Sequence, residues 1–215
     1  MLASNQLLTK MQKPRNPVER LPTDERRSAI VAAALRLAAG NSPAAITTTE
    51  LASAVGLSQG ALFKHFASKD AVWLAAMDWA AEHLLQTLTD AASSSPSSCA
   101  ALRAVFDAHV AFVAEHPGVP RLVLHQLQQI GDTPIKQRAR KLMQAHRALV
   151  QDLLRKAVGT HETTPDLDVP AATTMFLGQI QGLVMQSVMT GKGAVMRELA
   201  ARVFAIYERG IRVRT

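Results

Sequence analysis

Apolar residues recur every three or four positions along most of the chain, which is the spacing of one face of an α-helix. Short clusters of glycine, proline, serine and asparagine interrupt this pattern and mark the ends of its segments. The predicted helices cover residues 23–40, 47–56, 59–66, 68–89, 98–115, 119–130, 134–158, 170–190 and 194–211. Few stretches alternate apolar and polar residues as strands do, so we predict an all-α protein of about nine helices.

Two of these helices are short and are joined by a tight turn within residues 47–69. Thr47 stands three residues before Glu50, which is the spacing of a capping box at a helix start. Gly56 supplies the left-handed residue that commonly follows a helix end. We therefore expect a helix, a turn and a second helix in close succession.

The second helix of this pair has one apolar face and one face open to a partner. Ser58 is placed to cap it, and Leu62 and Phe66 share the apolar face. The other face carries Gln59, Gly60, Ala61, Phe63, Lys64 and His65. This layout predicts a helix-turn-helix, whose second helix lies in the DNA major groove. There, Gln59 suits an adenine and Ala61 a thymine methyl group.

The next helix begins with an unfavourable charge. Ser68 is placed to cap it, yet Lys69 follows directly, where the helix dipole disfavours a cation. A DNA phosphate bound at this helix start would explain the lysine. A solvated surface lysine is the alternative.

The charge balance supports a polyanionic partner. Twenty-four Lys and Arg residues stand against 17 Asp and Glu, so the net charge is +7. Residues 1–22 carry four basic residues, one acidic residue and three prolines. They predict a mobile basic arm that follows DNA, or a plain disordered tail.

Several other functions find no support in the sequence. Cys99 is the single cysteine, which excludes a disulfide within the chain and fits the reducing cytoplasm. None of His83, His109, His116, His125 and His146 forms a short metal-binding pair, so we expect no metal site. A phosphate loop and a nucleophile constellation are also missing, and we predict neither an enzyme nor a bound cofactor.

One uncharged segment, residues 169–191, is long enough to span a bilayer. It also contains three glutamines, three threonines and internal glycines, which a membrane span disfavours. We therefore predict a helix that is buried on most sides by protein, and no membrane partner.

The block from Thr23 to Trp79 resembles the N-terminal domain of the TetR family of bacterial transcriptional repressors. The resemblance rests on Ile46-Thr47-Thr48, Leu51-Ala52, Val55-Gly56-Leu57-Ser58, Leu62-Phe63-Lys64-His65-Phe66 and Ser68-Lys69-Asp70. It implies a helix-turn-helix DNA-binding domain over residues 23–69, with a linking helix that extends to about residue 89. Residues 70–215 would form a larger helical domain for ligand binding and dimerisation, and they match the family only in architecture.

The resemblance also implies roles for single residues. Thr47, Thr48 and Thr49 would lie at the start of the helix that crosses the DNA backbone, with Thr48 bonded to a phosphate. Lys69 would grip a second phosphate. The recognition helix would offer Gln59, Gly60, Ala61, Phe63, Lys64 and His65 to the DNA.

The chain departs from the family at two positions of this helix. The family often has a hydroxyl residue where this chain has Ala61, and usually a tyrosine where it has Phe63. Two phosphate contacts are thus missing. We expect the phosphate grip to depend more on Lys64, Lys69 and the basic arm, and binding to be sensitive to salt.

For the C-terminal part, the resemblance implies a homodimer through the last two helices and a small-molecule site. Polar groups such as His109 and Gln179 among apolar side chains are typical of such a cavity. The candidate pocket residues are Trp73, Met77, Phe106, His109, Phe112, Leu122, His125, Met143, His146, Phe176 and Gln179. Ordinary core is the alternative for most of them.

We therefore predict a transcriptional repressor that binds a palindromic double-stranded operator as a homodimer. A largely apolar inducer would release it from the DNA. The alternatives are a helical enzyme and a non-specific nucleic-acid-binding module that reuse a helix-turn-helix fold.

Overall fold

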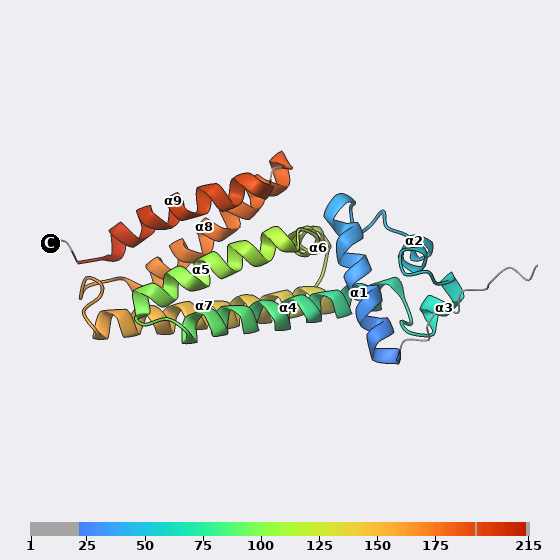
Figure 1. Ribbon diagram of the computed structural model, residues 1–215, viewed down its shortest axis with the longest axis horizontal. Coiled ribbons are helices and arrows are strands. Elements are labelled where there is room, and N and C mark those ends of the chain that lie inside the picture. The colour runs from blue at the N-terminus through green and yellow to red at the C-terminus, as the bar shows by residue number, and fades with distance from the viewer. Residues whose placement is uncertain (1–21, 192, 214–215) are drawn as a thin grey trace, which may run out of the picture.

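The computed structural model describes residues 22–191 and 193–213, so the predicted basic arm lies outside the described residues except for Pro22. The described residues form nine α-helices, which confirms the predicted fold class. The helices are α1 (Thr23–Gly40), α2 (Thr48–Ser53), α3 (Gln59–Phe63), α4 (Lys69–Ser93), α5 (Ser98–Glu115), α6 (Gly118–Leu127), α7 (Pro134–Gly159), α8 (Val169–Thr190) and α9 (Gly193–Ile211). The molecule is elongated, with α1, α2 and α3 at one end and the C-terminus at the other (Figure 1).

Helix α4 links the two ends of the molecule. It starts next to α1 and runs on into the bundle, where it packs against α5 and α7 (Figure 1). Its buried side chains follow the predicted stripe, which includes Trp73, Met77, Ala80, Leu84 and Leu88. Because this stripe contacts α1 at one end and α5 and α7 further along, both ends of the molecule share one hydrophobic core.

The larger bundle consists mainly of α4, α5, α7, α8 and α9. Its centre is aromatic: the ring of Phe106 lies 5.8 Å from that of Phe176 and 5.0 Å from that of Phe204. Tyr207 packs against the same group, and its hydroxyl donates a hydrogen bond to the Ala172 carbonyl (3.0 Å). The buried hydroxyl is thus satisfied while the ring contributes to the core.

The far end of the bundle is closed by a carboxylate cap. The Glu162 side chain accepts hydrogen bonds from the backbone amides of Ser98 (3.0 Å) and Cys99 (2.8 Å) at the start of α5. Burial alone would raise the pKa of Glu162, but these hydrogen bonds outweigh it and lower the pKa to about 2. The loop between α7 and α8 is therefore held against α5 by charge-assisted bonds.

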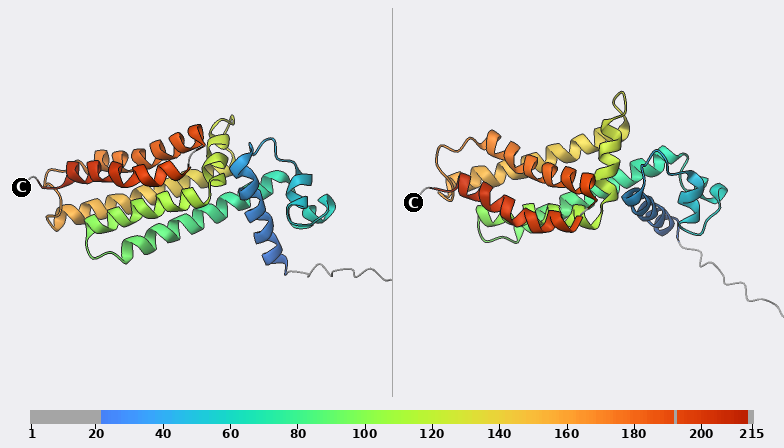
Figure 2. Two further views of the ribbon diagram at one scale, coloured as in Figure 1. Left: turned by 45° about the horizontal axis from the view of Figure 1, so that its top comes forward. Right: turned by 90° about the horizontal axis from the view of Figure 1, so that it is seen from above.

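Helix α6 crosses the junction between the two ends and packs against α1 (Figure 2). Gly118, its first residue, lies so close to α1 that a Cβ atom would stand 2.0 Å from the Leu35 carbonyl oxygen. No side chain separates the two backbones at this point. Only glycine permits such an approach.

Two expectations at the DNA-binding end are wrong in detail. Thr23 does not cap α1: Pro22 occupies that position, no side chain caps the helix, and Thr23 is its first residue. Asp24 and Glu25 still lie in the first turn, where the helix dipole favours them.

The second helix of the helix-turn-helix is shorter than predicted. Helix α3 ends at Phe63 and not at Phe66, because the His65 amide bonds the Leu62 carbonyl three residues back (2.9 Å) and tightens the chain into a turn. The turn brings Phe66 into the core, where it is 3% exposed. The apolar spacing of Leu62 and Phe66 thus reflects shared burial, not one continuous helix.

The sequence pattern placed three further helix ends differently. Helix α2 ends at Ser53, before the predicted residue 56. Helix α4 continues to Ser93, past the predicted end at about residue 89, and the Ser94 and Ser95 hydroxyls donate to carbonyls one turn earlier (2.8 and 2.9 Å). The Ser94 amide still bonds the Asp90 carbonyl (3.1 Å), so the helical hydrogen-bonding pattern continues to the edge of the serine-rich stretch. Helix α6 ends at Leu127, before the predicted residue 130.

Within the single chain, α8 is buried on one face and not on most sides. Met175 and Met189 are 61% and 79% exposed, and Gly178 and Gln181 lie on the exposed surface as well. One face of α8 packs against α7 and α9 and the other is open. Among the described residues, no helix is long and apolar enough to cross a membrane.

Replacing Gly118 by alanine is expected to destabilise the protein, because the added methyl group would overlap the Leu35 carbonyl. Overpacking of this kind costs about 1–3 kcal/mol of unfolding free energy. Gly40→Ala is the control, since nothing lies within 4 Å of its Cβ position in the same helix as Leu35. Urea unfolding followed by circular dichroism measures both variants. Equal stability of the two would contradict the close packing of α1 and α6.

Candidate DNA-binding interface and regulatory core

The helix-turn-helix is built from local hydrogen bonds that the sequence predicted. The Glu50 amide donates to the Thr47 hydroxyl (3.1 Å), and the Thr47 amide donates to the Glu50 carboxylate (2.7 Å). This confirms the capping box. Gly56 has the expected left-handed backbone, with a φ of 69°. The turn thus sets α3 at a fixed angle to α2.

Helix α3 presents the predicted face to solvent. Ser58 caps it, because its hydroxyl accepts from the Ala61 amide (3.2 Å), and Leu62 is buried beneath it. Gln59, Gly60, Phe63 and Lys64 are exposed, while Ala61 and His65 are half-buried. The helix lies at the end of the molecule furthest from the C-terminus (Figure 1).

A side-chain bond joins the two helices across this face. The Gln59 amide nitrogen donates to the Thr48 hydroxyl (2.7 Å). Gln59 keeps its carbonyl oxygen and one N–H free, which are the two groups that pair with adenine. Thr49 is exposed beside this bond, whereas Thr47 is engaged in the capping box.

Lys69 has a bonding partner that the sequence did not indicate. Its ammonium group donates to the Ala44 carbonyl (2.8 Å), while Ser68 caps α4 by accepting from the Ala71 amide. The lysine therefore ties the loop before α2 to the start of α4. Two of its three N–H donors remain for another acceptor.

Arg27 supports the interface and was missed by the sequence reasoning. From α1, its guanidinium donates to the His65 carbonyl and stacks on the Phe66 ring, with 4.2 Å to the ring centre. It holds the turn after α3 in place. Because 38 residues separate Arg27 from His65, no local pattern could have indicated this contact.

The candidate inducer residues lie on five helices, α4, α5, α6, α7 and α8. Most are buried and the remainder half-buried: Trp73, Met77, Phe106, His109, Phe112, Leu122, His146 and Phe176 are buried, and His125, Met143 and Gln179 are half-buried. Phe112 borders a shallow cavity of about 230 Å³ between α4 and α5, beside Trp79 and His116. The others pack against helices.

Two of these residues form a buried imidazole pair. The rings of His109 on α5 and His146 on α7 lie 4.9 Å apart. Within the described part of the chain, both nitrogens of His146 and Nδ1 of His109 are buried without a hydrogen-bond partner. Unsatisfied buried polar atoms are uncommon and cost free energy. They leave donors and acceptors available to a polar group that enters this core.

Burial also keeps these imidazoles neutral. Desolvation lowers the pKa of His146, and desolvation together with repulsion from His146 lowers the pKa of His109. Two further members of the candidate set have an unpartnered buried atom among the described residues, Nε1 of Trp73 and Oε1 of Gln179. The core around the histidine pair is therefore apolar with a few neutral polar groups, a composition that ligand sites share.

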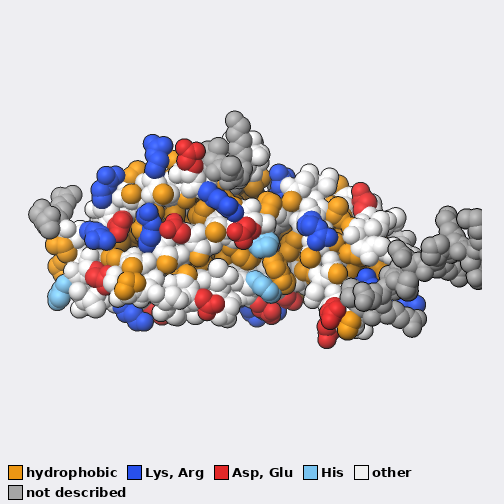
Figure 3. Space-filling model, viewed as in Figure 1, with side chains coloured by type: hydrophobic (Ala, Val, Ile, Leu, Met, Phe, Trp, Pro, Cys, Tyr) orange, Lys and Arg blue, Asp and Glu red, His pale blue; other side chains and the backbone are white. Residues whose placement is uncertain are grey.

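Charges elsewhere are mixed. In the view of Figure 3, Lys and Arg lie interspersed with Asp and Glu over the larger bundle. Among residues 22–191 and 193–213, no group of three or more His, Cys, Asp and Glu residues could hold a metal ion.

The histidine pair predicts a pH-dependent stability. The unfolded chain takes up protons below about pH 6.5, whereas His146 resists protonation in the folded state until about pH 4. The free energy of unfolding therefore has its full value above pH 6.5. It decreases as the pH is lowered from about 6.5 to about 4, because the unfolded chain binds a proton that the folded protein excludes. His146→Leu should flatten this fall in urea titrations between pH 7 and pH 4.

The control for this experiment is His161→Asn, at an exposed residue with a positive φ that asparagine tolerates. It should leave the pH dependence unchanged. A parallel fall for wild type and His146→Leu would show that the buried pair does not cause the effect.

Comparison with known proteins matches both parts of the chain to one family. Residues 30–76 match the family of bacterial regulatory proteins named after tetR, and residues 98–203 match a tetracyclin repressor-like C-terminal domain. The nucleoid occlusion factor SlmA of Vibrio cholerae is 24% identical over 158 residues, 73% of this chain and 81% of that protein. SlmA of Haemophilus ducreyi is 32% identical over 100 residues, 45% of this chain and 48% of that protein.

Solved structures share the fold at low identity. The fatty acid degradation regulator FadR of Bacillus halodurans has a TM-score of 0.76 and 17% identity, over 94% of this chain and 100% of that one. FadR of Bacillus subtilis, solved with stearoyl-CoA, has a TM-score of 0.73 and 18% identity, over 86% of this chain and 99% of that one. Together with the two matched domains, the helix-turn-helix and the helical bundle show that this chain belongs to the TetR family of DNA-binding transcription regulators, which are not enzymes.

Proposed function

We propose that this regulator is a ligand-released repressor that binds a palindromic operator as a homodimer in the cytoplasm. The observation that carries the proposal is the exposed face of α3, which is held by a cap at each side of a tight turn and supported from α1 by Arg27. A short rigid helix at the tip of the molecule is suited to enter a major groove.

We assign contacts with the bases and contacts with the phosphates to different residues of the helix-turn-helix. Gln59, Gly60 and Ala61 at the start of α3 would reach base edges, with Phe63, Lys64 and His65 beside them. Thr47, Thr48, Thr49 and Lys69 would lie against the backbone of the DNA. The bond between Gln59 and Thr48 supports this division, since a phosphate held by Thr48 would also orient Gln59.

The exposed apolar side chains of α8 and α9 support dimerisation through these helices. Met175, Met185, Met189 and Ile206 are between 43% and 79% exposed, although each is a large hydrophobic residue. Exposed Gly178 on α8 would permit a close approach of a second copy. Such a surface on adjacent helices is typical of a subunit interface.

The inducer would bind in the core around His109 and His146, lined by the remaining candidate residues. Their unpartnered nitrogens would pair with a polar group on a largely apolar ligand. Because the pair lies between α5 and α7, both packed on α4, a ligand there would move α4 and with it α3. Release requires that the ligand prefer the conformation that does not fit the operator. The stearoyl-CoA complex of FadR supports ligand binding by this fold.

The name of the curated relatives supports a second candidate, a nucleoid occlusion factor. A repressor should occupy few sites, each near a regulated promoter, whereas sites spread along the chromosome would favour the second candidate. Chromatin immunoprecipitation of the full chain would separate the two.

Selection of bound DNA from a random pool tests the proposal. The full chain should bind the selected sequence on the order of 10³-fold more tightly than random DNA. Gln59→Ala should cost about 1–3 kcal/mol, because it removes contacts at one base position. Equal affinity for selected and random DNA would favour the non-specific module.

Salt titrations of the complex with the selected DNA distinguish phosphate contacts from base contacts. Lys69→Ala and Lys64→Ala should each weaken all sequences and lower the salt slope by about 1. Lys64 is exposed and has no bond within the described chain. Comparing the two variants therefore shows how much of the effect of Lys69→Ala comes from loss of the Lys69–Ala44 bond. An unchanged slope for Lys69→Ala would limit that lysine to its structural role.

Ile206→Glu should weaken the proposed dimer, because it places a charge on an apolar face that is 66% exposed in the single chain. Analytical ultracentrifugation should show a shift toward monomer, and operator affinity should fall with it. Arg155→Glu on α7 is the control for an added acidic residue, since the partners of Arg155 among the described residues, Gln151 and Asp152, belong to its own helix. An unchanged sedimentation of Ile206→Glu would place the dimer interface elsewhere.

A further inference from the structure

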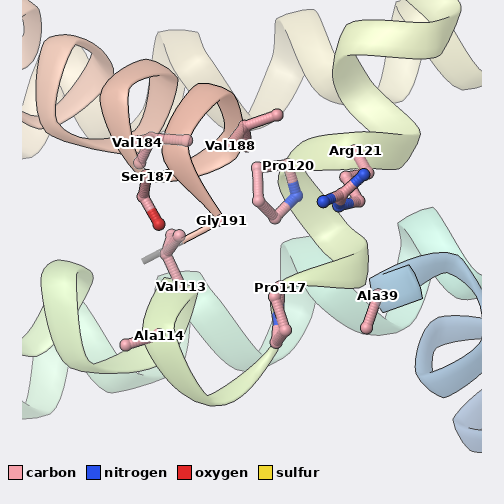
Figure 4. A pocket seen from close by; sticks show the side chains of 10 residues that line it. All are labelled: Ala39, Val113, Ala114, Pro117, Pro120, Arg121, Val184, Ser187, Val188 and Gly191. Carbon is pink, nitrogen blue, oxygen red and sulfur yellow. The ribbon is translucent and has the colours of Figure 1, made fainter. Parts of the chain in front are cut away.

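A cavity of about 230 Å³ lies where α1, α5, α6 and the end of α8 meet (Figure 4). We call it the junction cavity. None of the candidate inducer residues lines it. Most of its lining side chains are apolar: they include Val113 and Ala114 of α5, Pro117 and Pro120 around the start of α6, and Val184 and Val188 of α8.

Two polar side chains interrupt these apolar walls. Arg121 of α6 lies beside Pro120 with its guanidinium toward the cavity, and Ser187 of α8 points its hydroxyl toward Val113 (Figure 4). Arg121 is partly buried, and within the described chain it has neither a hydrogen bond nor an ion pair. Other arginines of the bundle, such as Arg103 and Arg138, pair with an aspartate.

This combination selects a class of ligand. A partly desolvated guanidinium with five donors favours a carboxylate, which it binds through two parallel hydrogen bonds. The valine and proline walls favour an apolar body next to that carboxylate. The cavity volume of about 230 Å³ lies below the range of about 300–1,000 Å³ that is common for drug-sized ligands, so the ligand must be small.

The position of the junction cavity links its occupancy to the DNA-binding end. Ala39 of α1 lies at its edge, and α6 forms one wall while α8 forms another. A ligand wedged between α6 and α8 would shift α6. Helix α1 must follow, because Gly118 and Leu35 are in contact through their backbones. Arg27 on α1 in turn supports the turn after α3.

We propose that the junction cavity binds a small monocarboxylate with an apolar body and that its occupancy weakens DNA binding. Arg121 pairs with the carboxylate and the apolar body lies on Val113, Val184 and Val188. The site is separate from the histidine core, so the chain integrates two ligand signals. Carboxylate binding does not depend on the proposed function, whereas the effect on DNA binding rests on it.

Calorimetric titration of the full chain with hexanoate and benzoate tests the binding step. Acetate, which lacks the apolar body, and 1-hexanol and benzyl alcohol, which lack the carboxylate, should each bind at least tenfold more weakly. Arg121→Gln should weaken hexanoate at least tenfold. Arg155→Gln, at an exposed arginine of α7 remote from the cavity, should leave the affinity unchanged.

A second variant tests the apolar part of the site without changing a charge. Val184→Phe leaves Arg121 in place but fills the cavity, and should also abolish binding, while thermal unfolding verifies that each variant is folded. The proposal fails if neither hexanoate nor benzoate binds better than acetate, or if Arg121→Gln and Val184→Phe bind as wild type does.

Fluorescence anisotropy with the selected DNA tests the coupling. Saturating hexanoate should raise the Kd for that DNA several-fold in wild type and leave it unchanged in Arg121→Gln. Hexanoate binding without any change in this Kd would overturn the coupling and leave the repressor proposal intact. If no selected DNA is found, the repressor proposal fails, yet the calorimetric result still decides the carboxylate site.

Discussion

The burial of one stripe along α4 is the constraint on which the rest of the structure depends. Trp73 and Met77 pack near α1 at its start, and Leu84 and Leu88 pack in the bundle further on. A single rigid helix thus contributes to the core of both ends. Neither end can change its packing on α4 without an effect on the other, and this mechanical connection is what a ligand-controlled DNA-binding protein requires.

A second connection bypasses α4. At Gly118 the backbone of α6 touches that of α1, and Arg27 on α1 holds the turn after the recognition helix. The junction between the two ends is therefore a contact of three helices, α1, α4 and α6. Packed contacts of this kind transmit small shifts, because close-packed side chains do not deform continuously.

The polar groups of the molecule follow two opposite rules. In the helix-turn-helix they are satisfied by near neighbours, as the capping box and the Gln59–Thr48 bond illustrate. In the core of the bundle, both nitrogens of His146 and Nδ1 of His109 lack partners within the described chain. The satisfied bonds make the helix-turn-helix rigid. The unpartnered histidine nitrogens can still form hydrogen bonds in an apolar interior, which favours a ligand over a purely structural core.

Local sequence determined what depends on local bonds. Thr47, Glu50, Gly56 and Ser58 specify the helix-turn-helix because each acts within a few residues along the chain. Helical periodicity likewise gave the number of helices and the buried stripe of α4. Only the tertiary structure decided that Lys69 bonds Ala44, that Arg27 supports the turn at His65 and that one face of α8 is exposed in the single chain. These features, like the junction cavity, arise where residues distant in sequence meet, and a periodic pattern carries no information about which faces meet.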